Sequence, residues 1–409
     1  MTMTQDKVMA RRWAIVLAGG AIMGAALGVR HVQGLFLQPI TLDQGWSREA
    51  FGFTLAMQNL IWGLAQPFTG MIADRFGSTK VLLPGLLLYA AGLWVTAEAA
   101  STGTFLFGNG LLVGIALSGT AFGAVYGALS RIFPAEHRSW ALGVAGAIGG
   151  LGQFCMVPFA QGLIDNTGWI TALIVLAVTM VLLAPMVALL RDDPRAADTS
   201  GADQQSMMAA IKEACRHRGF WLLNLGFLAC GFQLAFIAGH MPAYLIDGGL
   251  GLEEASAALA IISLSNVAGT YLAGHLGGVM RRKYLLSGLH FVRAASMVVF
   301  VALPLTPISV YAFSFVMGFL WLGTVPLTNG LVSQIFGVRY ITTLFGIVFF
   351  GHQLGSFFGV WLGGAVFDAT GSYDPVWFGA VALGLIAAVV HLPIDDARIE
   401  RPSAAGVPA

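Results

Sequence analysis

Long apolar runs, separated by short polar segments, dominate the chain. A membrane-spanning helix needs about 20 mostly apolar residues, and twelve stretches of the sequence reach this length. In the first half of the chain they are residues 13–40, 49–73, 80–100, 104–132, 139–164 and 169–190. In the second half they are residues 219–246, 253–279, 284–304, 308–336, 341–366 and 375–393. The pattern therefore predicts an all-α membrane protein with about twelve transmembrane helices.

One long polar segment, residues 191–218, interrupts this pattern and carries the densest charge in the chain. We interpret it as a cytoplasmic linker, and its last part, MMAAIKEACRHRGF, has the pattern of a short surface helix. The sequence thus predicts an N-terminal six-helix bundle at residues 1–190, the linker, and a C-terminal six-helix bundle with a short cytoplasmic tail at residues 219–409.

The composition supports a membrane protein. Hydrophobic residues make up 57% of the 409 residues and charged residues only 10%, whereas about a quarter of a soluble domain is charged. A net charge of +1 gives no support for nucleic-acid binding. The three cysteines, Cys155, Cys215 and Cys230, fit no metal-ligand spacing, and we interpret them as small apolar residues. We therefore expect no cofactor, no metal and no enzymatic activity.

Basic residues gather on one side of the predicted helices. When both termini are placed in the cytoplasm, all Lys and Arg except Arg30, Arg48 and Arg293 lie on the cytoplasmic side or at its border. This distribution follows the positive-inside rule. The sequence therefore predicts a multi-pass protein of the cell inner (plasma) membrane, in contact with membrane lipid and with both termini cytoplasmic.

The two halves of the chain contain a weak internal repeat. LIDNTGW at the end of the fifth predicted helix matches VFDATGS at the end of the eleventh, so that Asp165 and Asp368 are 203 residues apart. Pro39 and Pro242, each at the outer end of the first helix of its half, have the same separation. Parallel repeats of this kind place a substrate site near the membrane midplane, between two halves that rock against each other.

The segment after the second predicted helix, GMIADRFGSTK, resembles the loop signature of the major facilitator superfamily. The resemblance covers nearly the whole chain and implies two six-helix bundles that transport a substrate by alternating access. It implies a gating role for Gly70, Asp74, Arg75, Gly77 and Lys80. Gly70 allows close helix contact and Gly77 a tight turn, while Asp74 can pair with a neighbouring arginine or cap a helix end across the inner gate. An ordinary polar turn is the alternative.

The corresponding segment of the second half, GHLGGVMRRK at residues 274–283, keeps glycines and basic residues but has no acid. We therefore expect an asymmetric latch centred on Asp74.

Within the superfamily, two segments look like the oxalate–formate and monocarboxylate carrier branch. They are GLFLQPI, which leads into GWSR at residues 45–48, and HMPAY at residues 240–244. The resemblance implies a small carboxylate as substrate. Those carriers typically have an arginine in the eighth helix, and the eighth helix here, SLSNVAGTYLAGHLGG, has none.

Charged groups inside the predicted helices are the first candidates for a substrate site, because an unpaired charge in a bilayer is costly. No Asp or Glu lies in the central part of any predicted helix, whereas Arg30 and Arg293 do. This favours an anionic or neutral substrate over a cation. Arg30 is the best candidate, because a guanidinium can bind a carboxylate with two hydrogen bonds. A structural arginine bonded to backbone carbonyls is the alternative, which we favour for Arg293.

Polar residues elsewhere in the helices complete the candidate substrate site. Gln33 lies one turn after Arg30, and Gln233 takes the position of Arg30 in the repeat. The remaining candidates are Gln58, Asn59, Tyr126, Gln153, Trp321, Thr324, His352 and Gln353. Such side chains often connect helices instead of binding a ligand. His240 is a candidate for a gate or proton-linked role, or for interfacial packing, and His352 can change its charge near neutral pH.

These observations predict a monomeric secondary active transporter for a small organic anion, a carboxylate by the family resemblance, working by proton symport or anion exchange. Three alternatives remain at this stage: uptake of a larger nutrient such as a vitamin, export of a drug or metabolite, and a membrane sensor that does not transport.

Overall fold

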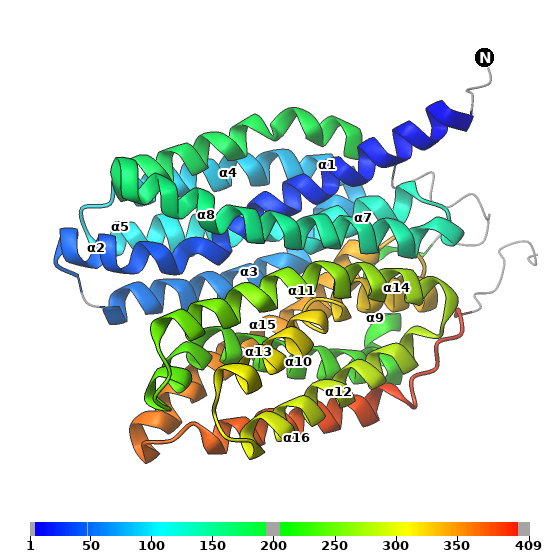
Figure 1. The fold of residues 1–409 in the computed structure, drawn as a ribbon. Coiled ribbons are helices and arrows are strands. Elements are labelled where there is room, and N and C mark those ends of the chain that lie inside the picture. Colours follow the sequence, from blue (N-terminus) through cyan, green and yellow to red (C-terminus); the bar gives the residue numbers. More distant parts are fainter. Residues whose placement is uncertain (1–4, 47, 194–204, 400–409) are drawn as a thin grey trace, which may run out of the picture.

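The computed structural model describes residues 5–46, 48–193 and 205–399, and it is helical throughout these ranges apart from short connections. Two groups of helices lie side by side, one above the other in Figure 1, and α9 lies at one end of the lower group. The backbone of Arg48, Pro242 and Asp368 belongs to described helices, but their side chains are not among those described.

The first group contains the helices of the N-terminal half. They are α1 (Gln5–His31), η1 (Val32–Phe36), α2 (Leu37–Gln44), α3 (Arg48–Phe76), α4 (Thr79–Ala97), α5 (Thr102–Phe105), η2 (Leu106–Leu112), α6 (Val113–Thr120), α7 (Phe122–Ile132), α8 (Ala135–Leu182) and η3 (Ala184–Leu190).

The second group contains the helices of the C-terminal half, preceded by a short connecting helix. They are α9 (Met207–Arg216), α10 (Arg218–Asp247), α11 (Leu252–Val279), α12 (Arg282–Ala302), α13 (Pro307–Phe319), α14 (Thr324–Phe336), α15 (Ile341–Thr370) and α16 (Asp374–His391). α9 lies within the segment for which the sequence predicts a surface helix.

The prediction of twelve transmembrane helices is confirmed. Ten helical segments among the described residues are long and apolar enough to cross a membrane. One of them, Ala135–Leu190, is 56 residues long and contains two crossings, because the backbone leaves the helix at Gly168 with a φ of +79°. The twelfth crossing is α3. It is 29 residues long, but its mean hydropathy is lower than that of the ten segments because it carries polar residues such as Gln58, Asn59 and Gln66.

The fourth and tenth predicted helices are interrupted where the sequence predicts continuous ones. The tenth stops at Phe319 and resumes at Thr324. A break inside a membrane is tolerated when side chains bind the freed backbone groups. Here Asn266 accepts a hydrogen bond from the Leu322 amide at 3.0 Å, and Arg293 donates to the Leu320 carbonyl. The length of the apolar run in the sequence therefore predicts where the tenth crossing begins and ends, but it does not predict the interruption between Phe319 and Thr324.

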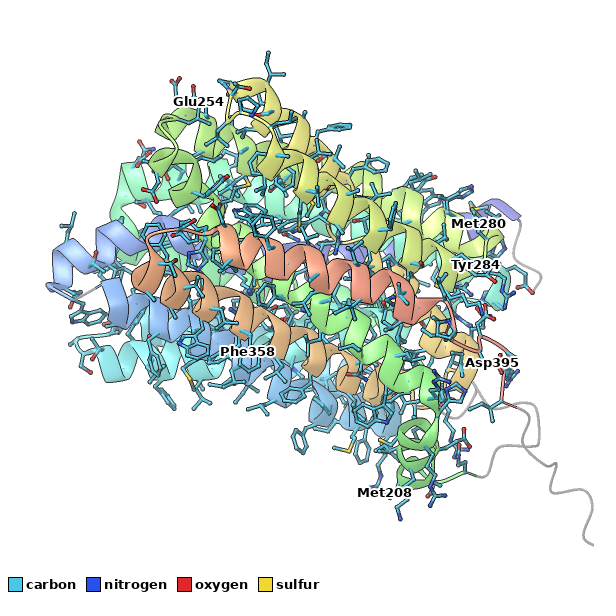
Figure 2. All side chains as sticks on the ribbon, turned by 90° about the horizontal axis from the view of Figure 1, so that it is seen from below. Met208, Glu254, Met280, Tyr284, Phe358 and Asp395 are labelled. Carbon is cyan, nitrogen blue, oxygen red and sulfur yellow. The ribbon has the colours of Figure 1, made fainter. Side chains whose placement is uncertain are left out.

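The two ends of the helix bundle are distinguished by their charged residues. Figure 2 shows Tyr284 and Asp395 near one end, with Glu254 at the other. We call the first the Asp74 end, because α3 finishes there beside the start of α15. Between the ends, large apolar side chains face outward, as expected next to lipid. Phe291 in the middle of α12 is 57% exposed, and Leu87 in the middle of α4 is 48% exposed.

The two halves contact each other mainly along two helix pairs, α3 with α15 and α8 with α11. Small residues allow the close approach. A Cβ atom added at Gly274 would lie 2.2 Å from the Cα of Gly143, and one added at Gly70 would lie 2.6 Å from the Thr342 carbonyl oxygen. Gly52 and Gly162, far from the Asp74 end on α3 and α8, have no described atom within 4 Å of such a Cβ. The halves are therefore pressed together at the Asp74 end.

This contact predicts a specific cross-link. A Cβ at Gly278 would lie 3.5 Å from the Cβ of Ser139, within the range of about 3.5–4.5 Å found in disulfides. In a chain whose three native cysteines are replaced, we expect Ser139→Cys with Gly278→Cys to form a disulfide on mild oxidation. Mass spectrometry of the proteolysed protein measures its yield.

Adding Gly274→Ala should lower the yield, because the new methyl group would collide with Gly143. Gly288→Ala is the matched control, since a Cβ there meets nothing within 4 Å. An undiminished yield in the Gly274→Ala protein would contradict the close packing of α8 on α11.

Candidate functional site

Arg30 lies in the last turn of α1, where its side chain is half-buried. It donates a hydrogen bond through Nη2 to the side-chain oxygen of Asn59 on α3. Its Cζ atom lies 5.4 Å from the centre of the Trp62 ring, close enough for a cation–π interaction. Its buried Nε has no hydrogen-bond partner. No carboxylate of the described residues forms an ion pair with it, so the positive charge is not neutralised by the described protein.

The contacts of Asn59 and Trp62 continue into the other half. Gln353 on α15 donates through Nε2 to the Asn59 carbonyl oxygen at 3.4 Å. The ring centres of Trp62 and Phe349 are 4.9 Å apart. These contacts join the two halves beside Arg30, and Gly63 makes room for them, since a Cβ there would lie 2.6 Å from the Gln353 Cβ.

His352 extends this contact deeper into the second half. Its Nδ1 lies 3.2 Å from Oε1 of Gln353, and its ring stacks on Phe349 with centres 5.5 Å apart and planes 6° apart. The ring of Phe227 on α10 packs against it at 4.7 Å. His352 is half-buried and therefore stands between the interface and the interior of the second half.

Cys230 and Arg293 form the far end of this chain of contacts. Arg293 on α12 donates through Nη1 to the Cys230 sulfur at 3.1 Å, and through Nη2 to the carbonyls of Leu320 and Trp321. These carbonyls are free because α13 ends just before them. The structure thus shows the backbone contacts expected of a structural arginine, together with a thiol contact that the sequence does not predict.

We call the connected residues the polar belt. Its members are Arg30, Asn59, Gln353, His352, Cys230 and Arg293. The belt runs from α1 across the interface to α12 and ends in a guanidinium on each side. Because it contains two permanent positive charges and no carboxylate, it suits an anion.

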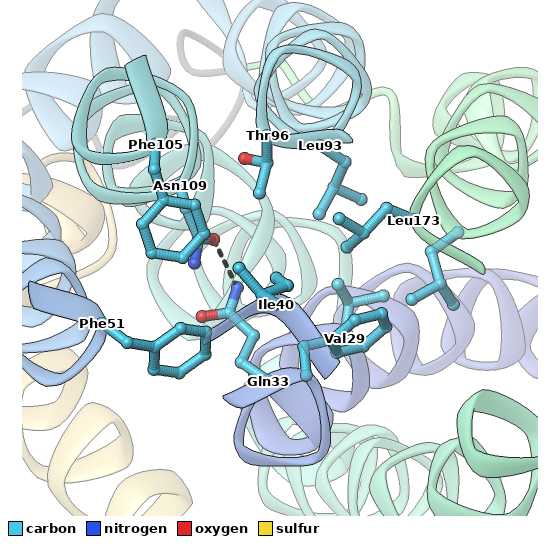
Figure 3. Close-up of a pocket in the computed structure, with 11 residues that line it drawn as sticks. Val29, Gln33, Ile40, Phe51, Leu93, Thr96, Phe105, Asn109 and Leu173 are labelled. Carbon is cyan, nitrogen blue, oxygen red and sulfur yellow. Dashed lines mark hydrogen bonds between the residues drawn. The ribbon is translucent and has the colours of Figure 1, made fainter. Parts of the chain in front are cut away.

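Two other predicted residues lie in a separate network inside the first half. Gln33 donates to Oδ1 of Asn109 at 2.9 Å, and Gln58 donates to the Asn109 carbonyl oxygen at 2.7 Å. Figure 3 shows Gln33 and Asn109 beside a small pocket lined otherwise mostly by apolar side chains. All three side chains are buried. They bind one another, which is the helix-connecting alternative for Gln33 and Gln58.

Of the remaining candidates, two contact the belt and three are described by other contacts or by their burial. Thr324 contacts it directly, with its hydroxyl 3.3 Å from the Cys230 sulfur. Trp321 joins it through its backbone carbonyl, and Gln153 is half-buried on α8. Gln233 is fully buried and donates to the Ala380 carbonyl of α16 at 2.9 Å. Tyr126 is also fully buried, with its hydroxyl close to Gly146 and without a hydrogen-bond partner.

His240 lies far from the belt, near the end opposite Asp74. Its Nε2 is 2.8 Å from the Val360 carbonyl oxygen, and its ring is 5.4 Å from that of Tyr373. These contacts tie α10 to α15 within the second half, so the structure shows packing there and leaves a gating role as a prediction.

Asp74 is the centre of a buried ionic cluster at its end of the bundle. Both alternatives expected for it are present, because it pairs with Arg131 at 2.5 Å and also caps the start of α15. It accepts hydrogen bonds from the backbone amides of Thr342 at 3.1 Å and Thr343 at 2.6 Å. A carboxylate is favoured there by the free amides and the dipole of a helix N-terminus. Arg131 also pairs with Asp192 at 2.5 Å, so a guanidinium joins two acids.

The other gating candidates surround this cluster. Gly70 faces the Thr342 carbonyl, as described above, and Gly77 ends α3 with a φ of +91°, a conformation that suits glycine. Arg75 and Lys80 are exposed, and the Arg75 guanidinium lies 5.2 Å from the Phe76 ring.

The second half also has an acidic residue at the Asp74 end. It does not come from the loop at residues 274–283, which contains no acid. Asp396, after α16, pairs with Arg281 at 2.5 Å. The hydrogen bond from Arg281 lowers the pKa of the Asp396 carboxyl. The neighbouring Arg282 donates across the interface to the Ser139 hydroxyl at 2.7 Å. Asp74 and Arg282 thus connect the halves with opposite charges.

Sequence reasoning missed several residues of both sites. Arg131 and Asp192 lie 57 and 114 residues from their partners Asp74 and Ser78, and nothing local marks them as partners. From the sequence alone Cys230 is interpreted as a small apolar residue, and only the structure shows its contact with Arg293. A search for basic residues at the ends of predicted helices could have found Arg131.

Comparisons with known proteins agree with this architecture. The model of the Major Facilitator Superfamily matches residues 16–360. An uncharacterised transporter of that type from Bacillus subtilis, YcxA, is 24% identical over 93% of this chain and 94% of its own length. Human monocarboxylate transporter 11 is 23% identical over 94% of this chain and 83% of its own.

Among solved structures, the fucose:proton symporter FucP of Escherichia coli has a similar fold. The TM-score is 0.69 with 18% identity, and the match covers 92% of this chain and 97% of the symporter chain.

We predict that Asp74→Asn loosens the contact between the halves. The amide loses the negative charge that Arg131 and the start of α15 bind, at a cost of roughly 1.5–3 kcal/mol for hydrogen bonds to a charged group. The Ser139→Cys/Gly278→Cys pair reports the effect from the other side of the interface. Its cross-linking yield should fall if the halves separate as rigid bodies.

Asp395→Asn serves as the control, because this carboxylate is exposed at the same end. A lowered melting temperature with an unchanged cross-linking yield would show that Asp74 stabilises α3 and α15 locally without holding the halves together.

Proposed function

The chain belongs to the major facilitator superfamily, and from this premise we propose that it is a secondary active transporter for a small organic anion, a carboxylate. In our proposal it lies in the inner membrane with both termini cytoplasmic, as the distribution of Lys and Arg indicates. The single observation that carries the choice of an anion is Arg30, whose charge no described carboxylate neutralises.

The physical argument concerns the cost of charge in the membrane interior. Removing an ion from water costs several kcal/mol even after relaxation, and an opposite charge nearby recovers much of this. Arg30 has an amide oxygen and an aromatic ring as partners, which are weaker than a carboxylate. A carboxylate ligand would therefore neutralise Arg30 and be neutralised by it. The human relative is a monocarboxylate transporter, which supports the same class of substrate.

The aromatic rings beside Arg30 indicate the rest of the ligand. Trp62 and Phe349 pack together at 4.9 Å next to the guanidinium, so an apolar group attached to the carboxylate would find rings to contact. This arrangement supports a carboxylate with an apolar body, and it keeps a larger anionic nutrient as the second candidate.

The way in which the halves meet supports transport by alternating access. In the proposed orientation, the Asp74 end is cytoplasmic, and the close packing there closes the cytoplasmic side. A solved structure of FucP shows that symporter in an outward conformation, which supports reading this arrangement as outward-facing. Rocking would break the Asp74 contacts with α15 and the Arg282 contact with Ser139, and would expose the belt to the cytoplasm.

We predict that Arg30 distinguishes an acid from its amide. Truncating one partner of a buried, hydrogen-bonded ion pair typically costs about 2–5 kcal/mol, or roughly 30-fold to several-thousand-fold in affinity. Arg30→Gln should weaken binding of a carboxylate by this amount. Arg30→Lys should weaken it less, because the charge remains while the planar fork is lost. Calorimetry with paired acids and amides, such as pyruvate with pyruvamide and benzoate with benzamide, measures both effects.

Amide binding should hardly respond to either change. His31→Gln is the neighbouring control, because His31 is exposed. Equal losses for acid and amide would make Arg30 a structural residue, and no loss for either would remove it from the substrate site. Binding only of larger anions from a wider panel would favour the second candidate.

A further inference from the structure

Cys230 and Arg293 form a buried pair in which only one member has an obvious charge. Both residues are 0% exposed, and the guanidinium Nη1 lies 3.1 Å from the sulfur. An arginine stays protonated in proteins. Its charge must therefore be balanced inside the second half or remain uncompensated there.

The surroundings of Arg293 offer few ways to balance it. Its hydrogen bonds to the Leu320 and Trp321 backbone are to neutral carbonyls. Among the described residues no carboxylate forms an ion pair with it. His290, near it on α12, stacks on His391 of α16 at 5.2 Å, and a histidine supplies no negative charge. Among the described contacts of Arg293, the thiol of Cys230 is the group that becomes an anion by losing a proton, and a neighbouring arginine favours the thiolate.

Two further groups can stabilise or protonate such a thiolate. The Thr324 hydroxyl lies 3.3 Å from the sulfur and can donate to it. The side chain of His352 also approaches the sulfur. Because His352 is only half-buried and contacts Gln353 at the interface, it provides a route for protons between the interface and Cys230.

We propose that Cys230 and Arg293 form a thiolate–guanidinium ion pair, and that this thiolate, reached through His352, is the proton-binding site of the transport cycle. The proposal rests on the proposed function, in which Arg30 binds the anion. A proton that binds the thiolate forms the S–H bond and leaves the Arg293 charge unbalanced. The belt then carries one more positive charge, which favours a carboxylate. One proton and one carboxylate thus enter together without net charge.

The S–H stretching band in infrared spectra tests this without a substrate and without reagent access to the buried sulfur. We would use the full chain in lipid nanodiscs with Cys155→Ala and Cys215→Ala, so that Cys230 is its only cysteine. The band should be nearly absent at about pH 8 and grow on acidification toward about pH 5, a change on the order of tenfold. His352→Gln should slow the growth of the band after a rapid drop in pH, because a group on the proton route sets the rate of protonation and not its equilibrium. An unchanged rate would overturn the route through His352.

The control is the chain with Cys155→Ala and Cys230→Ser, which keeps only the half-buried Cys215. This chain gives the reference intensity of the band for a thiol outside the Cys230–Arg293 pair. Arg293→Gln should give Cys230 a band throughout the range, whereas Arg293→Lys should keep the pH dependence. The measurement on the chain with intact Arg293 decides the outcome if these variants do not fold.

A band of full intensity for Cys230 at every pH would overturn the ion pair. A band absent at every pH would show a permanent thiolate and overturn the proton-binding role. Neither result depends on carboxylate binding at Arg30. Failure of this inference and failure of the proposed function are therefore distinguishable.

Discussion

The interior of a membrane protein has a low dielectric constant, and every charge inside it needs a counter-charge or a strong dipole close by. This constraint is met differently in two parts of the molecule. At the Asp74 end, Arg131 is held between two carboxylates within hydrogen-bond distance. In the polar belt, Arg30 and Arg293 have amide, carbonyl, aromatic and thiol partners instead. The described part of the belt is thus short of negative charge, which is the basis of the proposed anion site.

The ionic cluster has a second consequence, because it joins the two halves as well as neutralising Arg131. Asp74 belongs to α3 in the first half, and the amides that it binds belong to the start of α15 in the second. Its carboxylate can form these bonds only when the halves are close together. The glycines at the same end make such closeness possible, since any side chain at Gly70 or Gly274 would strike backbone atoms across the interface. Electrostatics and packing therefore favour the same closed arrangement, which is the kind of discrete contact on which a two-state movement depends.

Much of the fold could be predicted from the sequence, because a membrane crossing requires a long apolar run and the run itself marks the helix. The loop motif also predicts the chemistry of Asp74. The site is harder to predict for a physical reason. These helices are apolar on most faces, so the sequence gives little sign of which side faces the interface. Gln33 and Asn59 illustrate this: the first binds Asn109 inside one half, and the second contacts Arg30 and Gln353 at the interface.

Long-range pairs escape sequence reasoning for a related reason. Arg131 reaches Asp192 across 61 residues of chain, and Arg293 reaches Cys230 across 63. Each pair forms because of how the helices pack against one another. No local sequence pattern predicts the packing of smooth apolar surfaces. The interruption of the tenth crossing is similar, because it depends on Asn266 and Arg293 from other helices.

The segment after α16 bears on how the molecule is made. Asp396 binds Arg281, its backbone carbonyl accepts a hydrogen bond from Gln334 at 2.7 Å, and the Ile399 amide binds the Ile335 carbonyl at 3.1 Å. All of these partners precede this segment in the chain, so they leave the ribosome and enter the bilayer before it. During synthesis Arg281 therefore has no ion pair with Asp396 until all twelve crossings have been translated. The second half therefore acquires this ion pair and these backbone contacts only after its last helix has been translated.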